Sequence, residues 1–249
     1  MLKYLLLILA IYSLSIQRVL AQSVVQTNNQ LWLGYMSNTT INGKHSLWND
    51  VHYVPNGFFI IRTGITKQYN WVNATIGYAY GKLPNASNKD KLQRNEHRPW
   101  AQVQASIIMP RKWIFIPRIR YDARLRQETI NGVLNNSYSF VHRFRIMTSF
   151  RKSITKNPIK IGSPYIAFSN EVLLNVGQST TTQSFDQNRF SIMVGTVQKN
   201  IQIQVGYMNR YVKASDNLFT KNNTLVLWVT HRLTLKKTTN SSNLIQDGE

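Results

Sequence analysis

Residues 113–151 alternate between apolar and polar side chains, the pattern of β-strands with two unlike faces. One face is aromatic and aliphatic: Trp113, Phe115, Ile119, Tyr121, Leu125, Tyr138, Phe140, Phe144, Ile146 and Phe150. The other carries the guanidinium groups of Arg118, Arg120, Arg124, Arg126, Arg143, Arg145 and Arg151. Guanidinium groups are rarely buried without partners, so the two faces must meet different surroundings. The alternation alone does not say which face is outside.

The rest of the chain is a succession of similar segments, most of them near the ten residues that a tilted membrane strand requires. Further strands are predicted at 30–39, 44–53, 58–67, 71–80, 96–109, 164–176, 188–198, 201–212 and 224–236. Residues 23–29 are predicted to be loose, and 127–137 are interpreted as a polar break. No segment has helical periodicity. Short and long connections alternate from Trp71 onward, as turns at one rim and loops at the other would.

These segments predict an all-β fold, an antiparallel up-and-down transmembrane β-barrel of about 10–12 strands over residues 22–236. The count comes to about eleven, whereas single-chain bacterial barrels have even numbers. Either a short N-terminal strand escapes the pattern, or two of the first segments are one strand. Aromatic residues near segment ends are expected to form interface girdles: Trp32, Tyr35, Tyr53, Trp71, Tyr80, Trp100, Trp113, Tyr138, Tyr207 and Tyr211.

The N-terminus has the features of a secretory signal peptide, with a charged start, an apolar run and a small residue at the cleavage site. We expect residues 1–21 to be removed by cleavage after Ala21, and the polar tail 237–249 to be disordered. The chain has no cysteine, so no disulfide can stabilise it. Beyond the signal, no apolar stretch is long enough for a transmembrane helix.

The chain is strongly basic, with a formal net charge of +20, and removal of Lys3 and Arg18 with the signal leaves +18. Such a balance indicates polyanionic partners. Export argues against nucleic acid, and no nucleic-acid-binding motif is present. The expected partners are therefore outer-membrane lipid and lipopolysaccharide, with a small anionic ligand as a further candidate.

Four motifs resemble those of a known family: Gln30-Leu31-Trp32-Leu33-Gly34-Tyr35, Glu96-His97-Arg98-Pro99-Trp100, Phe185-Asp186-Gln187-Asn188-Arg189 and Gly206-Tyr207-Met208-Asn209. By these, the chain is similar to domain of unknown function 2490 over roughly residues 28–236. The resemblance implies an exported bacterial barrel of the outer membrane, in Gram-negative cells, with no established activity and no catalytic residues to transfer. Unlike many outer-membrane barrels, the chain does not end in an aromatic residue, so the insertion signal is expected within Leu225–Leu235.

If the apolar face meets lipid, the charged side chains line the lumen. The predicted lumen charge network comprises Arg62, Arg98, Arg118, Arg120, Arg124, Arg126, Arg143, Arg145, Arg210, Arg232, Asp50, Glu96, Asp122 and Glu171. A barrel of this strand number has a narrow interior filled by side chains, which favours a salt-bridged structural plug. The excess of arginine over acid supports the alternative of an anion-tolerant channel or an anionic-ligand site.

The remaining motifs carry little chemistry, so we expect no catalytic, cofactor-binding or metal-binding residues. Glu96 and His97 point to opposite faces of a strand, and Glu96–Trp100 is interpreted as a rim anchor. Asp186 and Asn188 are expected to cap a turn while Arg189 joins the charge network. The five histidines lack metal-ligand spacing.

Two other functions remain open at this point. One is an outer-membrane lipid-modifying enzyme, for which Ser137, Ser139 and His142 are the nearest candidates. The other is a soluble periplasmic β-sandwich or lipocalin-like binder whose apolar face is inside. The favoured hypothesis is a non-enzymatic outer-membrane barrel.

Overall fold

A computed structural model describes residues 24–84, 92–155, 159, 161–177, 185–215 and 218–235. The predicted signal peptide and the tail 237–249 lie outside the described residues. Within the described part, no helix is both long enough and apolar enough to cross a membrane.

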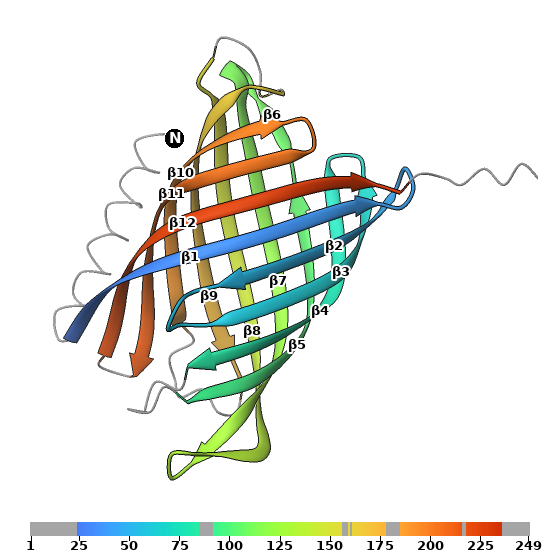
Figure 1. The fold of residues 1–249 in the computed structure, drawn as a ribbon. Coiled ribbons are helices and arrows are strands. Elements are labelled where there is room, and N and C mark those ends of the chain that lie inside the picture. The colour runs from blue at the N-terminus through green and yellow to red at the C-terminus, as the bar shows by residue number, and fades with distance from the viewer. Residues whose placement is uncertain are drawn as a thin grey trace, which may run out of the picture.

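The described residues form one twisted sheet that closes on itself as a barrel (Figure 1). Its elements are β1 (Val24–Thr40), β2 (His45–Tyr53), β3 (Phe59–Tyr69), β4 (Val72–Pro84), β5 (Gln93–Ala105), β6 (Ile107–Met109), the short turn η1 (Pro110–Lys112), β7 (Trp113–Ile130), β8 (Val133–Ser153), β9 (Pro164–Val176), β10 (Phe185–Gln198), β11 (Ile201–Ser215) and β12 (Leu218–Thr234). Neighbours along the chain pair antiparallel, and pairing of β1 with β12 and of β5 with β7 completes the wall. The predicted all-β barrel is confirmed.

The barrel has eleven strand positions, because β5 and β6 are two parts of one strand. The register against β7 runs unchanged from Gln104↔Arg118 in β5 to Ile107↔Phe115 in β6. Antiparallel neighbours all the way round require an even number of strands, so an odd number leaves one parallel pair. That pair is β1 with β12, in register from Val24↔Leu218 to Thr40↔Thr234. The count of about eleven read from the sequence is therefore confirmed, and the parity that it left open is odd for the described residues.

Two segments that were predicted to lie outside strands belong to the sheet. Residues 24–29 extend β1 along β12, although no partner strand lies on their other edge. The predicted polar break at 127–137 is the end of a long β7–β8 hairpin, which projects beyond the rest of the wall (Figure 1). Asn131 and Gly132 join its strands with φ of 51° and 81°, the left-handed conformation that two-residue hairpin turns require. Both segments are polar because they extend past the apolar band.

We call the two ends of the barrel the turn end and the loop end. The turn end carries connections 41–44, 70–71, 110–112 and 199–200, the connection 154–163 and the end of β12. The loop end carries the start of β1, the connection 54–58, the projecting hairpin and the strand ends that flank 85–91 and 178–184. Long connections thus predominate at one end, but 154–163 breaks the predicted alternation.

The outer face carries a band of exposed aliphatic side chains. Ile65 and Ile76 are register partners on it. A second run of partners is Val103, Ile119, Ile146 and Val172, and a third is Val194, Val205, Leu227 and Leu33. Ile76 is 68% exposed and Ile119 is 62% exposed. Along each strand, the residues that alternate with these aliphatic side chains face the interior, where charged and amide groups are buried. The barrel is therefore apolar outside and polar inside.

Two tryptophans of the predicted girdle lie inside the barrel instead. Trp100, 3% exposed, packs on the paired glycines Gly64 and Gly77, and a Cβ at Gly77 would come within 2.8 Å of its ring. Trp32, 5% exposed, packs edge-on against Phe58, the last residue of the loop-end connection 54–58. The girdle interpretation is wrong for both, because each is on the inward face of its strand. For Trp100 this also overturns the rim-anchor interpretation.

Candidate functional site: the charged interior of the barrel

Glu96 on β5 accepts hydrogen bonds from three arginines, more than any other carboxylate among the described residues. It is 1% exposed and accepts hydrogen bonds from Arg98 Nε at 2.8 Å, Arg124 Nε at 2.9 Å, Arg124 Nη2 at 2.7 Å and Arg126 Nε at 3.0 Å. Arg98 is two residues along the same strand and thus on the same face. Arg124 and Arg126 come from β7, which pairs with β5. One buried carboxylate therefore joins two strands.

A second cluster crosses β7, β8 and β9. Asp122, fully buried, accepts from Arg120 Nε at 2.8 Å and from Arg145 Nε at 2.6 Å. Glu171 on β9 pairs with Arg118 at 2.7 Å, and Arg145 lies 4.0 Å from it. Arg145 therefore links the two carboxylates.

Arg120 also lies over the ring of Trp100, with its guanidinium carbon 4.2 Å from the ring centroid. The contact has the geometry of a cation–π interaction. It places Trp100 between the paired glycines of β3 and β4 and the cation on β7. The Arg120–Asp122 cluster is thus packed against the ring of Trp100.

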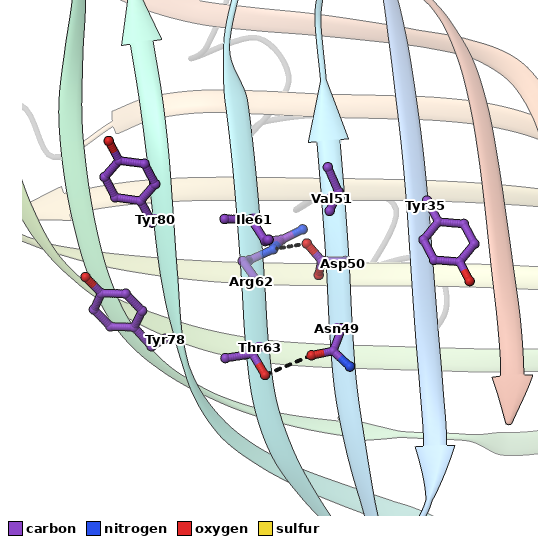
Figure 2. A pocket seen from close by; sticks show the side chains of 9 residues that line it. All are labelled: Tyr35, Asn49, Asp50, Val51, Ile61, Arg62, Thr63, Tyr78 and Tyr80. Carbon is purple, nitrogen blue, oxygen red and sulfur yellow. Dashed lines mark hydrogen bonds and ion pairs between the residues drawn. The ribbon is translucent and has the colours of Figure 1, made fainter. Parts of the chain in front are cut away.

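The third cluster is centred on Asp50 of β2. Asp50 accepts from Arg62 Nε at 2.6 Å and from Trp48 Nε1 at 2.7 Å, and His52 Nε2 lies 3.7 Å from it. Figure 2 shows the Asp50–Arg62 pair beside the hydrogen bond between Thr63 and Asn49, whose length is 2.9 Å. Adjacent residues of the same two strands thus form one pair on the buried side and another on the exposed side of the wall.

The outer side of this region is hollowed. A depression of about 310 Å³ lies there between the exposed rings of Tyr35 and Tyr78 and the half-buried ring of Tyr80 (Figure 2). Its polar contact, between Thr63 and Asn49, is internally satisfied. The depression therefore offers aromatic edges and no free charge.

Asp186 joins the charged interior as well, which the sequence pattern did not indicate. It pairs with Arg143 at 2.9 Å and accepts from Asn175 Nδ2 at 2.8 Å. A register shift between Phe185 and Gln187 marks a β-bulge, and bulges re-aim side chains. The predicted turn cap at Asp186 is therefore wrong, because the residue belongs to β10 and bonds to groups on β8 and β9.

Arg189 of β10 pairs with Glu171 at 3.1 Å, as was expected of its membership in the charge network. The fourteen predicted lumen residues did not include Arg189, which was expected in the network from its motif alone. They did not include Arg151 either, although strict alternation places both on the arginine face. Asn188, the other expected turn cap, instead donates to Asn170 on the exposed side. Alternation alone would have found the two arginines, whereas the bulge could not have been read from it.

The structure places the fourteen predicted network residues as follows. Arg62, Arg98, Arg118, Arg120, Arg124, Arg126, Arg143 and Arg145 form ion pairs, as do Asp50, Glu96, Asp122 and Glu171. Arg210 has no acidic partner among the described residues: it donates to Gln30 Oε1 at 2.9 Å and lies 5.1 Å from the Trp32 ring. Arg232 is exposed near the turn end, also without an ion pair within the described chain.

Positive charge exceeds negative charge in this interior. With Arg189 and Asp186 included, nine arginines pair with five carboxylates in the described residues, an excess of four positive charges. Arg151 and Arg210 add to it without an ion pair there. Burial without full neutralisation is costly, so the surplus needs aromatic faces, amides, water or a bound anion.

The interior contains a cavity of about 530 Å³. Its lining includes Asn42 and Lys44 of a turn-end connection, and farther inside it reaches Trp32, His52 and Trp228. Most of the other lining groups are amides, hydroxyls and guanidiniums. The cavity is therefore a polar vestibule on the turn-end side of the barrel.

The candidate catalytic residues are not brought together. His97 is on the outer face, hydrogen-bonded to the Tyr78 hydroxyl, while Glu96 points inward. His142 Nδ1 lies 2.7 Å from the Tyr121 hydroxyl. Ser137 donates to Glu128 at 2.5 Å, and Ser139 donates to the Arg126 carbonyl at 3.3 Å. Neither serine has a histidine as its hydrogen-bond partner.

In the part of the chain that the structure describes, no group of three histidine, aspartate or glutamate side chains is placed to hold a metal ion. The same part contains no cysteine, since the whole sequence has none. The ion pairs of the charged interior are formed between arginines and carboxylates.

Comparison with known proteins identifies a family but no activity. A family model described as "Protein of unknown function (DUF2490)" matches residues 29–222, from within β1 to within β12. No curated protein and no solved structure matched the chain. The match spans nearly all of the barrel and confirms the resemblance seen in the four motifs. The chain therefore belongs to the DUF2490 family of proteins of unknown function.

Proposed function

We propose that the protein is an integral β-barrel of the bacterial outer membrane whose interior is closed by ion pairs, with a structural or ligand-binding role rather than an enzymatic one. The observation that carries this proposal is that the outer face of the barrel is apolar and its interior is charged, the reverse of a soluble protein. Soluble proteins rarely expose contiguous apolar patches of more than a few hundred Å². A band of Ile, Val and Leu side chains on nearly every strand, around a charged interior, is typical of a barrel in lipid.

The details of the outer face support the same location. Tyr69, Trp71 and Trp113 lie at the turn end. The ammonium group of Lys152 lies 5.2 Å from the centroid of the Trp113 ring, and that of Lys67 lies 5.1 Å from the centroid of the Tyr69 ring. Aromatic rings and long basic side chains are the residues that anchor a protein at the lipid headgroups. A periplasmic sandwich or lipocalin-like protein would instead bury its aliphatic face.

Fractionation tests the location directly. The protein should sediment with outer membranes, resist extraction by high salt or carbonate, and dissolve in detergent. Samples left unheated should migrate on a denaturing gel differently from boiled ones, because a closed barrel resists detergent. Release of the protein by osmotic shock would refute the membrane location.

A narrow anion-tolerant channel is the second candidate, and the excess of arginine over carboxylate is the observation that favours it. The layers of Glu96, Asp122 and Trp100 argue for a closed barrel instead, because each carboxylate is fully engaged. In a planar lipid bilayer we expect the purified protein to be electrically silent. Reproducible single-channel conductance steps with anion preference would refute the closed barrel and support the channel.

A further inference from the structure

The vestibule on the turn-end side is suited to a ligand by its shape. Its volume of about 530 Å³ lies within the range of small-molecule pockets, roughly 300–1,000 Å³. On its inner side, Trp32, His52 and Trp228 pack edge-on against one another. Phe58 packs on Trp32 from the loop end, where Val54 is also buried. The vestibule is therefore a pocket with one inner wall of rings, not a uniform tunnel.

The lining of the vestibule is strongly cationic. Its basic groups are Lys44, Arg62, Arg118, Arg120, Arg145, Arg151, Arg189 and Arg232, and its acids are Asp50 and Glu171. Eight positive and two negative groups leave an excess of six positive charges. Both acids are already engaged, Asp50 by Arg62 and Glu171 by Arg118 and Arg189. Low-dielectric walls of one sign concentrate the field and attract a counter-ion.

Several of these guanidiniums carry buried donors that nothing in the described chain accepts. Arg120 is 3% exposed, and its Nη2 has no hydrogen-bond partner there. The Nε atoms of Arg118 and Arg151 are likewise buried and unpartnered within the described residues. A buried unsatisfied donor is costly, so such groups generally meet water or a ligand oxygen. Three such donors on β7 and β8 therefore show that acceptors of the described chain do not match the cationic surplus of the vestibule wall.

The neutral part of the lining is rich in hydrogen-bonding groups. Gln102, Gln104, Gln202 and Gln204 enter the vestibule from β5 and β11, and Ser149 from β8. Such groups suit a hydroxylated, water-soluble molecule better than an acyl chain. Guanidinium forks match the geometry of phosphate, to which they can donate two parallel hydrogen bonds.

We propose that this vestibule binds a small phosphorylated molecule, with the phosphate held by Arg151 and Arg232, which line it near the turn end, and the remainder contacted by the glutamines. Binding follows from the interior lining alone, so it goes beyond the proposed membrane role and does not depend on it. If the protein proved to be periplasmic, the membrane proposal would fail while phosphate binding would remain. If a membrane barrel held only water in its vestibule, phosphate binding would fail while the membrane proposal would remain. The two proposals therefore fail separately.

Calorimetric titration of the detergent-purified mature chain with inorganic phosphate, at constant ionic strength set by chloride, tests the proposal. We expect saturable binding at one site. The double variant Arg151→Gln with Arg232→Gln should weaken it at least about tenfold, since each loses a charge-assisted hydrogen bond. Lys152→Gln is the matched control: it removes the same charge one residue from Arg151, but from the side of the wall where Lys152 lies over Trp113.

Two results would overturn the proposal: no saturable binding at millimolar phosphate, or equal weakening by Lys152→Gln, which would show counter-ion attraction only. Circular dichroism checks that the variants fold. If the double variant does not fold, Arg232→Gln alone decides, because Arg232 is exposed at the end of β12 and has no described ion pair to lose. An unchanged affinity in that variant would remove Arg232 from the site and overturn the arrangement of Arg151 and Arg232 around the phosphate.

Discussion

Replacing Glu96 by glutamine removes the negative charge of a buried carboxylate that accepts hydrogen bonds from three arginines. Glutamine keeps one oxygen, which can still accept from Arg98 and from Arg124 Nε. Its amide nitrogen would replace the oxygen that accepts from Arg124 Nη2 at 2.7 Å and from Arg126 Nε at 3.0 Å. Two charge-assisted hydrogen bonds are lost, and donor faces donor at both positions. The change leaves three guanidiniums without their counter-charge.

The cost follows from these losses. Hydrogen bonds to charged groups contribute about 1.5–3 kcal/mol each, and breaking a buried ion pair costs about 3–5 kcal/mol. We take about 4 kcal/mol as the expected loss of unfolding free energy for Glu96→Gln. For a chain of 150–250 residues, each kcal/mol shifts the melting temperature by about 2–4 °C, so the expected decrease is about 8–16 °C.

Thermal unfolding in detergent micelles, followed by circular dichroism of the sheet signal, measures this decrease. Glu128→Gln is the control, because Glu128 lies on the projecting hairpin and its described partner is Ser137 rather than an arginine. Adding Arg126→Gln to Glu96→Gln should restore part of the stability, since the least buried of the three arginines would no longer be unneutralised. Equal melting temperatures for the two glutamate variants would refute the view that the cluster stabilises the barrel.

Two further predictions test the wall itself. Asn28 and Asn222 are register partners across the parallel β1–β12 pair, so cysteines at these two positions should form a disulfide on oxidation. Cysteines at Gln26 and Asn222 should not, because strand geometry places their Cα atoms roughly 8 Å apart. Equal cross-linking of both pairs on a non-reducing gel would contradict the register. Gly77→Val should lower the unfolding free energy by at least about 1–3 kcal/mol, because its Cβ would meet the Thr63 carbonyl oxygen and the Trp100 ring. An unchanged melting temperature would show that this contact is not tight.

The connections and strand ends show where sequence reasoning was weakest. A polar stretch has no apolar face to reveal its period, so residues 24–29 and 127–137 carried no strand signal, yet both are held by ladders to β12 and within the β7–β8 hairpin. The Asn131–Gly132 pair was the available signal for the second segment. For the first there was none, because its only partner lies almost two hundred residues away in sequence.

Alternation with a period of two, by itself, determined that the chain is a β-protein with one apolar and one guanidinium-bearing face, since successive side chains on a strand point to opposite sides. It also identified most of the arginines and four of the five acids that meet in the interior. Only the tertiary structure decided which face is outside, because both faces satisfy the same period. Ring closure likewise decided the parallel β1–β12 seam, the inward position of Trp32 and Trp100, and the bulge that turns Asp186 to Arg143. Each of these depends on which strand lies beside which, and a local pattern does not contain that information.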